Sequence, residues 1–161
     1  MKTIASFTVD HERLLTGLYV SRVDMVGEEP VTTFDLRMTR PNTEPVMDTA
    51  AIHALEHLGA TYLRNDPAWG SKVVYFGPMG CRTGFYLILA GNLTSRDVWN
   101  LVKNTMEFIA NFEGDIPGAS AAQCGNYLDM NPAMAKYHAR KYLSEVFEAV
   151  DDARLNYPGT V

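Results

Sequence analysis

The chain has only two cysteines, Cys81 and Cys124, among its 161 residues, and this small number excludes a fold held by a disulfide network. We therefore expect a protein of the reducing cytoplasm, in which a cysteine with a special role is a metal ligand or a reactive thiol. Cationic residues are also few, because 14 lysines and arginines face 19 aspartates and glutamates, for a net charge of −5. This balance argues against nucleic acid or an anionic membrane as a partner.

Long apolar runs and nucleotide motifs are absent as well. No stretch approaches the roughly 18–20 apolar residues of a membrane span, and Ser6, Thr8 and Asp10 interrupt the start of the chain in a way that argues against a signal peptide. The sequence has no GxGxxG fingerprint, P-loop or GxSxG elbow, so nothing supports a nucleotide cofactor. Internal repeats and linkers are also missing, and we expect a single domain over residues 1–161.

Hydrophobic periodicity predicts an α+β fold. Segments rich in β-branched and aromatic residues indicate strands over 18–26, 31–38, 72–76 and 83–90. Segments with apolar residues at helical spacing indicate helices over 48–64, over 95–112 and from Asn131-Pro132 to about 149. Asp48, Thr94 and Asn131 are the expected helix caps, and 113–130 is a long loop. This order predicts an antiparallel sheet of about four strands with helices packed on one face.

The sharpest chemical signal is the run His53-Ala54-Leu55-Glu56-His57, inside the first predicted helix. Two histidines at i and i+4 lie one turn apart on the same helix face, so their imidazoles can converge on one metal ion. Glu56 lies at the edge of that face, where it can exchange a proton with a bound molecule without being a ligand. The spacing is the inverted form of the zincin motif. The weaker alternative is a pair of hydrogen-bonded, partly buried histidines.

A catalytic metal site needs a third protein ligand, and the candidates are Cys124, Cys81, His11, His138 and the carboxylates. Cys124 is a candidate, because the glycine-containing run Gln123-Cys124-Gly125 can bring its thiolate close to an ion, although a small buried hydrophobe is also compatible. Cys81 follows a tight turn, and Arg37 or Arg82 could lower its pKa; a core cysteine is an equal alternative. Two further histidines, His11 and His138, are typical of surface positions.

Five short motifs together are more specific than the HxxEH run alone. They are Ser6-Phe7 with Asp10-His11, Phe34-Asp35-Leu36-Arg37 with Pro41-Asn42, Ile52-His53 with Leu55-Glu56-His57-Leu58, Pro78-Met79-Gly80-Cys81 with Thr83-Gly84 and Tyr86, and Ile116-Pro117 with Gln123-Cys124-Gly125. In this order and at these separations they resemble the S-ribosylhomocysteine lyases, the LuxS family, from about Ser6 to the third predicted helix.

The resemblance implies a homodimer with active sites at the subunit interface. It also implies one divalent metal ion per subunit, Fe²⁺ or alternatively Zn²⁺, and no organic cofactor. The family's roles fall on His53, His57 and Cys124 as metal ligands, on Cys81 and Glu56 as acid/base residues, and on Ser6, His11 and Arg37 as substrate-binding residues. Arg37 would lie near Cys81 and favour its thiolate, while Ser6 and His11 would come from the partner subunit.

The reaction implied by the resemblance cleaves S-ribosylhomocysteine to homocysteine and 4,5-dihydroxy-2,3-pentanedione. The second product is the precursor of the quorum-sensing signal autoinducer-2, and the first returns to the activated methyl cycle. The sugar carbonyl would migrate through enediolates stabilised by a Lewis-acidic metal, and β-elimination would then break the thioether. Many family members have an aspartate and a serine where this chain has Tyr75 and Gly77, and that aspartate helps to hold the homocysteine amino group.

Two other functions are compatible with the HxxEH run. In an inverted-zincin metallopeptidase the glutamate activates a metal-bound water, but the third ligand of that family is a distant downstream glutamate with no convincing counterpart here. A zinc-stabilised interaction domain would normally have four protein ligands, and a chain of this length can form a core without a metal.

Overall fold

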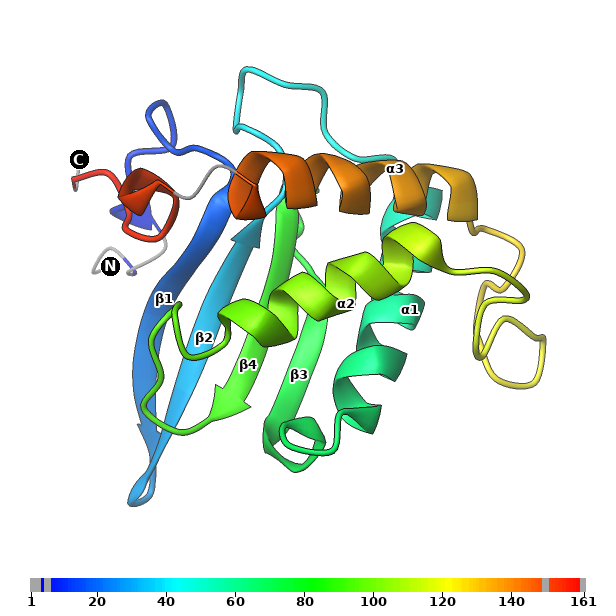
Figure 1. Cartoon of the computed structure of the whole chain (residues 1–161), viewed down its shortest axis with the longest axis horizontal. Coiled ribbons are helices and arrows are strands. Elements are labelled where there is room, and N and C mark those ends of the chain that lie inside the picture. Colours follow the sequence, from blue (N-terminus) through cyan, green and yellow to red (C-terminus); the bar gives the residue numbers. More distant parts are fainter. Residues whose placement is uncertain (1–3, 5–6, 149–150, 160–161) are drawn as a thin grey trace.

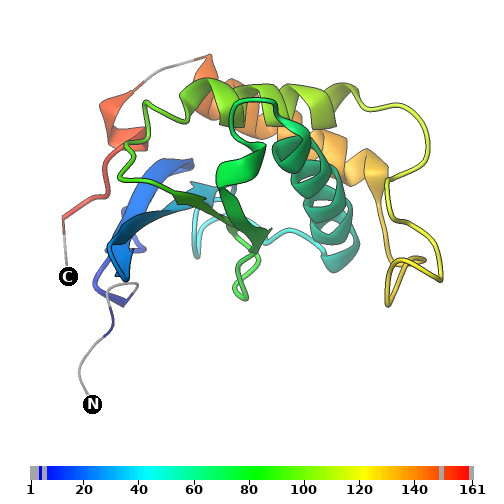
Figure 2. The same cartoon turned by 90° about the horizontal axis from the view of Figure 1, so that it is seen from below.

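The computed structural model describes residues 4, 7–148 and 151–159. Four antiparallel strands form one sheet in the order β1-β2-β4-β3, and helices lie on one face of it (Figures 1 and 2). The elements are β1 Gly17–Val26, β2 Glu29–Arg37, α1 Thr49–Asn65, β3 Val73–Pro78, β4 Gly84–Ala90, α2 Trp99–Asn111 and α3 Pro132–Tyr142. This arrangement confirms the predicted α+β class, and every predicted strand lies within two residues of the observed one.

Successive side chains along each strand point alternately to the face of the sheet that the helices cover and to the face without helices. Phe34, Leu36 and Leu87 belong to the covered face and are fully buried in the core. Asp35 and Arg37 point the other way, as the period-two pattern of 31–38 predicts, yet only 1% and 4% of their surfaces are exposed. The face of the sheet without helices therefore carries a buried polar cluster at its centre.

Two of the three predicted helix caps are confirmed. The Asp48 side chain accepts a hydrogen bond from the Ala51 amide, and the Asn131 side chain accepts one from the Met134 amide. The prediction for Thr94 was wrong, because α2 begins only at Trp99. Both the amide and the hydroxyl of Thr94 donate to the Asp97 carboxylate, which closes a separate turn before the helix.

The third helix also differs from its prediction. Regular α-helix ends at Tyr142 and gives way to a π-helical turn, Leu143–Phe147, closed by a hydrogen bond from the Glu148 amide to the Leu143 carbonyl. The wider turn leaves both Val146 and Phe147 in the core. Of the helices in the described ranges, none is long and apolar enough to cross a membrane.

His138 is a further correction. We expected it on the surface because Lys136, Arg140 and Lys141 surround it in the sequence, but only 8% of it is exposed. It lies on the same inner face of α3 as Ala135 and Tyr142, which are fully buried. Burial lowers the pKa of its imidazole, despite the opposing influence of the nearby Asp48 carboxylate.

Candidate metal centre and active site

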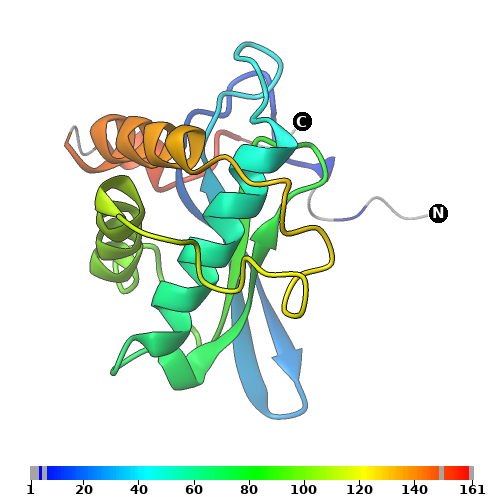
Figure 3. The same cartoon turned by 90° about the vertical axis from the view of Figure 1, so that its right-hand side faces the viewer.

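The two histidines of the HxxEH run meet a cysteine from the long loop. His53 and His57 lie one turn apart on α1, with ring centroids 4.8 Å apart. The loop between α2 and α3 passes beside α1 (Figure 3) and brings Cys124 Sγ to 3.3 Å from His53 Nε2. The structure thus brings together the three residues expected to be metal ligands.

The same loop also orients both imidazoles. His53 Nδ1 lies 2.9 Å from the Asp129 carbonyl oxygen, and His57 Nδ1 lies 2.8 Å from the Pro117 carbonyl oxygen. A carbonyl oxygen only accepts hydrogen bonds, so each Nδ1 must carry the proton. Each Nε2 then keeps a lone pair for a metal ion, an arrangement typical of metal-binding histidines. No pattern in the sequence indicates these two backbone contacts.

Gly118 allows the loop to approach α1 closely. Its φ is +75°, a conformation that favours glycine. A Cβ at this position would lie 3.2 Å from His57 Nδ1, against the ring that the neighbouring Pro117 carbonyl orients. Further along, the Ser120 carbonyl accepts hydrogen bonds from the amides of Gln123 and Cys124, so a closed turn positions the thiol.

The donor set fits a divalent transition metal. One ligand atom from each of His53, His57 and Cys124 lies within 4.8 Å of the other two, and all three residues are half-buried. Tetrahedral zinc with bonds of about 2.1 and 2.3 Å would place a nitrogen and a sulfur ligand roughly 3.5 Å apart, close to the distance between His53 Nε2 and Cys124 Sγ. Three protein ligands leave a fourth position open, as in catalytic sites.

Glu56, the predicted acid/base residue of the run, lies beside His57 on α1 and is half-buried. Within the part of the chain that the structure describes, its carboxylate has no hydrogen bond or ion pair. The carboxylate is therefore free to contact a bound molecule.

A second cluster surrounds Cys81, in the turn that joins β3 to β4. The exposed Cys81 Sγ lies 3.1 Å from Thr83 Oγ1 and 3.9 Å from an Arg37 guanidinium nitrogen. Burial alone would raise the pKa of this thiol, but the hydrogen bonds from Thr83 and the charge of Arg37 outweigh it and lower the pKa below its usual value. Cys81 thus has the electropositive, accessible surroundings of a reactive cysteine.

Arg37 belongs to a buried ion pair. Its guanidinium lies 2.6 Å from Asp35 Oδ2 and also donates to Thr83 Oγ1 at 2.5 Å. The Tyr157 hydroxyl donates to the same Asp35 oxygen at 2.8 Å. Thr83 and Asp35 occur in the quoted motifs, but we had assigned them no role, and nothing in the sequence pattern connected Tyr157 with this cluster.

One cavity of about 260 Å³ joins Cys81 and Arg37 to His11. His11 was expected from a partner subunit, but it already shares this cavity with Cys81 in one chain, so the origin of His11 stays a prediction. The ring is oriented by contact of Nδ1 with the Val9 carbonyl oxygen at 2.8 Å. Ser6, the other residue with that expectation, lies outside the described residues.

The three candidate metal ligands and Cys81 lie in neighbouring but separate parts of the structure. The Met47 amide, just before α1, donates to the carbonyl oxygen of Arg82, so the turn that carries Cys81 lies beside the start of that helix. The cavity at Cys81 is nevertheless lined by none of the three candidate ligands His53, His57 and Cys124.

Tyr75 and Gly77, where the chain departs from the family pattern, are sterically linked. They lie two residues apart on β3, and a Cβ added to Gly77 would overlap the hydroxyl of Tyr75. The tyrosine side chain therefore covers the glycine, while 48% of Tyr75 stays exposed. Any side chain at position 77 would have to displace the ring, so these two departures depend on each other.

Residues 4–153 match the protein family described as S-Ribosylhomocysteinase (LuxS). S-ribosylhomocysteine lyases from Clostridium beijerinckii and Clostridium acetobutylicum are 58% and 57% identical to this chain over 158 residues, which cover 98% of the chain and 99% of each relative. The S-ribosylhomocysteine lyase of Phocaeicola vulgatus is 56% identical, with 98% of both chains covered.

Proposed function

The chain belongs to the S-ribosylhomocysteinase (LuxS) family, and from this membership we propose that it is an S-ribosylhomocysteine lyase, a carbon–sulfur lyase that releases homocysteine. The observation that carries the proposal is that all the residues expected to perform the chemistry are present in this chain. The relatives' similarity extends over 98% of the chain, and within it lie a pre-oriented His₂Cys group, a free carboxylate at Glu56 and an acidified thiol at Cys81.

The substrate explains why two proton-transfer groups are needed. A ribose carbon is bonded to the sulfur of homocysteine, and β-elimination can break this bond when a carbonyl lies two carbons from the carbon that bears the sulfur, because the carbonyl acidifies the proton between them. The carbonyl must therefore move along the sugar. Each move takes a proton from a carbon beside the carbonyl and returns one to the former carbonyl carbon, so no net oxidation occurs.

Cys81 and Glu56 are the proposed carriers of these protons. Thr83 and Arg37 lower the pKa of Cys81 and so favour its thiolate, the form that can accept a proton. In the last step a base removes the proton beside the migrated carbonyl, the carbon–sulfur bond breaks, and the departing sulfur is protonated to give homocysteine. A divalent ion held by His53, His57 and Cys124, Fe²⁺ or Zn²⁺, would supply Lewis acidity toward the sugar oxygens when bound.

A homodimer would complete this site. The cavity with Cys81 and the metal group are separate in one chain, and Phe7 beside that cavity leaves 72% of its surface exposed. If the His11 side of one subunit faces the metal group of another, Cys81 and Arg37 accompany His11, because all three line one cavity. Each active site would then take its thiol from one subunit and its metal from the other.

Thiol release tests the reaction directly. The purified protein is mixed with S-ribosylhomocysteine without oxygen, and new free thiol is measured. We expect release by the wild type and none by Cys81→Ala, which should keep its fold and metal. If the folded, metal-loaded wild type releases no thiol, the proposed substrate is wrong. If Cys81→Ala stays active, the role of Cys81 is wrong.

Mixing two inactive variants tests the shared site. Cys81→Ala and His57→Ala are combined under conditions that allow subunits to exchange. A site built from two subunits should restore about a quarter of the wild-type activity, because half of the dimers are mixed and each has one complete site. A site built within one subunit predicts no recovery. Light scattering on the wild type establishes independently whether it is dimeric.

A further inference from the structure

The hydroxyl of Tyr157 begins a continuous series of polar contacts that ends at Cys81. It donates to Asp35 Oδ2 at 2.8 Å, and the same oxygen lies 2.6 Å from the Arg37 guanidinium. The other end of that guanidinium contacts Thr83 Oγ1 at 2.5 Å and Cys81 Sγ at 3.9 Å. Asp35 and Arg37 are both more than nine-tenths buried, so solvent screens this series little.

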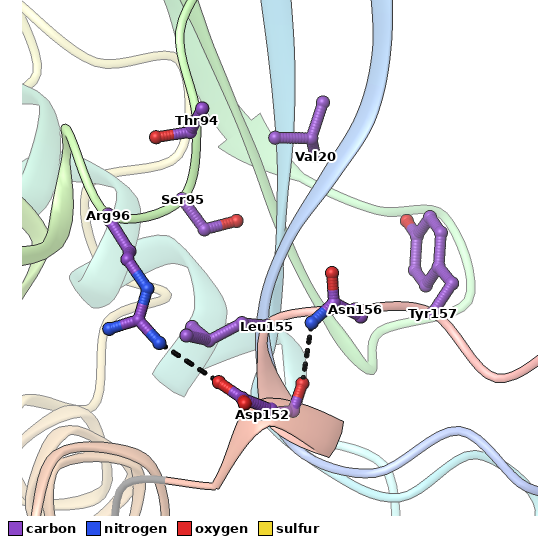
Figure 4. Close-up of a pocket in the computed structure, with 8 residues that line it drawn as sticks. All are labelled: Val20, Thr94, Ser95, Arg96, Asp152, Leu155, Asn156 and Tyr157. Carbon is purple, nitrogen blue, oxygen red and sulfur yellow. Dashed lines mark hydrogen bonds and ion pairs between the residues drawn. The ribbon is translucent and has the colours of Figure 1, made fainter.

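Several independent contacts hold Tyr157 in this place. It lies at the end of a tail that starts with the short helix Asp152–Arg154 (Figure 4). Arg154 donates to the Thr16 carbonyl oxygen at 2.8 Å, and Leu155 is buried in the core. The ring of Tyr157 stacks on Tyr19 with centroids 4.8 Å apart. Residue 157 lies just beyond residues 4–153, the range that the family model matches, and within the part of the chain aligned with the relatives.

Asp35 depends on this hydroxyl. A carboxylate can accept about four hydrogen bonds, but among the described residues Asp35 Oδ1 has no partner, and Oδ2 has only Arg37 and Tyr157. Burial and the nearby Asp35 charge raise the pKa of Tyr157, so its hydroxyl stays protonated and donates throughout the working pH range. Without this donor, Arg37 would be the only partner of the Asp35 carboxylate among the described residues. The carboxylate would then attract the guanidinium more strongly and draw it away from the Cys81 thiol.

We propose that Tyr157 is a positioning residue for Cys81, which acts through Asp35 to hold Arg37 against Thr83 and the thiol. The inference rests on the proposed lyase function only for the catalytic role of Cys81, because the acidity of the thiol is measurable without substrate. The titratable and charged groups that line the cavity with Cys81 are Asp35 and Arg37 from β2, Tyr86 from β4, His11 from the start of the chain and Tyr157 from the tail.

The test measures how fast Cys81 is alkylated across a range of pH. Metal-loaded wild type and Tyr157→Phe are treated with iodoacetamide, and mass spectrometry follows the peptide that contains Cys81 separately from the one with Cys124. The variant keeps the stacked ring and loses only the hydroxyl. We expect its alkylation midpoint to rise by about half a pH unit, which below the midpoint means roughly threefold slower reaction. The ascending limb of the kcat/KM profile should move equally.

Tyr19→Phe is the matched control. It removes a hydroxyl from the partner ring, but that hydroxyl donates to the backbone carbonyls of Leu15 and Ala153 and not to Asp35. Its midpoint should stay at the wild-type value. Equal shifts in both variants would mean general loosening of the tail, and no shift in a folded Tyr157→Phe would mean that the hydroxyl is unimportant. Either result overturns the proposal.

A double variant tests whether Tyr157 acts through Asp35. In an Asp35→Asn background, Tyr157→Phe should cause no further change in the Cys81 midpoint, because the charge at position 35 that pulls on Arg37 is gone, whether or not the hydroxyl still donates to the amide oxygen there. A further change would overturn the proposed route. If the midpoint shifts as expected in Tyr157→Phe but the wild type has no lyase activity, the proposed function is refuted and this inference stands.

Discussion

Arg37→Gln should be strongly destabilising, because it leaves the Asp35 charge buried without its cation. The two side chains are 4% and 1% exposed, and their charged atoms are 2.6 Å apart. Breaking a buried ion pair from one side costs about 3–5 kcal/mol. In a domain of this size each kcal/mol lowers the melting temperature by about 2–4 °C, so we expect a decrease of roughly 10 °C. Thermal and urea denaturation measure the loss.

The chain offers a control that differs mainly in burial. Arg22 and Asp24 on β1 have the same sequence spacing and the same 2.6 Å separation, but their side chains are 45% and 53% exposed. Arg22→Gln should therefore cost less than about 1 kcal/mol.

Removing both buried charges distinguishes an unpaired charge from lost packing. Asp35→Asn combined with Arg37→Gln should regain at least half of the stability that Arg37→Gln loses, because neither charge then remains buried. The reasoning is refuted if Arg37→Gln costs no more than Arg22→Gln, or if the double variant is no more stable than Arg37→Gln alone.

Further predictions concern the metal ligands, the thiol and the departure on β3. Cys124→Ala should lose bound metal while keeping the fold, measured by metal analysis and circular dichroism. Gly118→Ala should weaken metal binding by roughly 10–100-fold, the usual effect of disturbing a group that orients a ligand, measured by competition with a chelator. Thr83→Val should raise the lowered pKa of Cys81, so the ascending limb of kcat/KM moves to higher pH; an unmoved limb contradicts the assigned hydrogen bond. Gly77→Ser should lower the free energy of unfolding less in a Tyr75→Ala background than in the wild type, as measured by denaturant titration. An equal loss of stability in the two backgrounds would refute the steric link between Tyr75 and Gly77.

The convergence of two candidate metal ligands could be predicted because helix geometry fixes their spacing. Positions 53 and 57 must lie one turn apart on any α-helix, and the structure confirms that they converge. Cys124 was only slightly favoured by its surroundings in the sequence and needed the family resemblance. The carbonyl groups of Pro117 and Asp129 were not predictable, because they depend on the course of an irregular loop that no periodicity describes.

The errors in the fold have local causes. Thr94 has the chemistry of a helix cap, but Asp97 satisfies it within a single turn before α2 begins. The basic neighbours of His138 indicated solvent, although helical spacing places it with Ala135 and Tyr142 on the inner face of α3. For His138, helical spacing is therefore a better guide to burial than the charge of its sequence neighbours.

The buried pair of Asp35 and Arg37 shows how tertiary structure overrides a correct local pattern. Alternation along 31–38 predicts their face of the strand, but not that β2 lies inside the sheet between β1 and β4 or that Tyr157 reaches them from the tail. Apolar residues of similar volume are often as stabilising as a buried ion pair. This pair also leaves Asp35 Oδ1 and Arg37 Nε without hydrogen-bond partners among the described residues. Stability is therefore a poor reason for the pair, whereas a cation fixed beside an exposed thiol is what Cys81 would need to act as the proposed base.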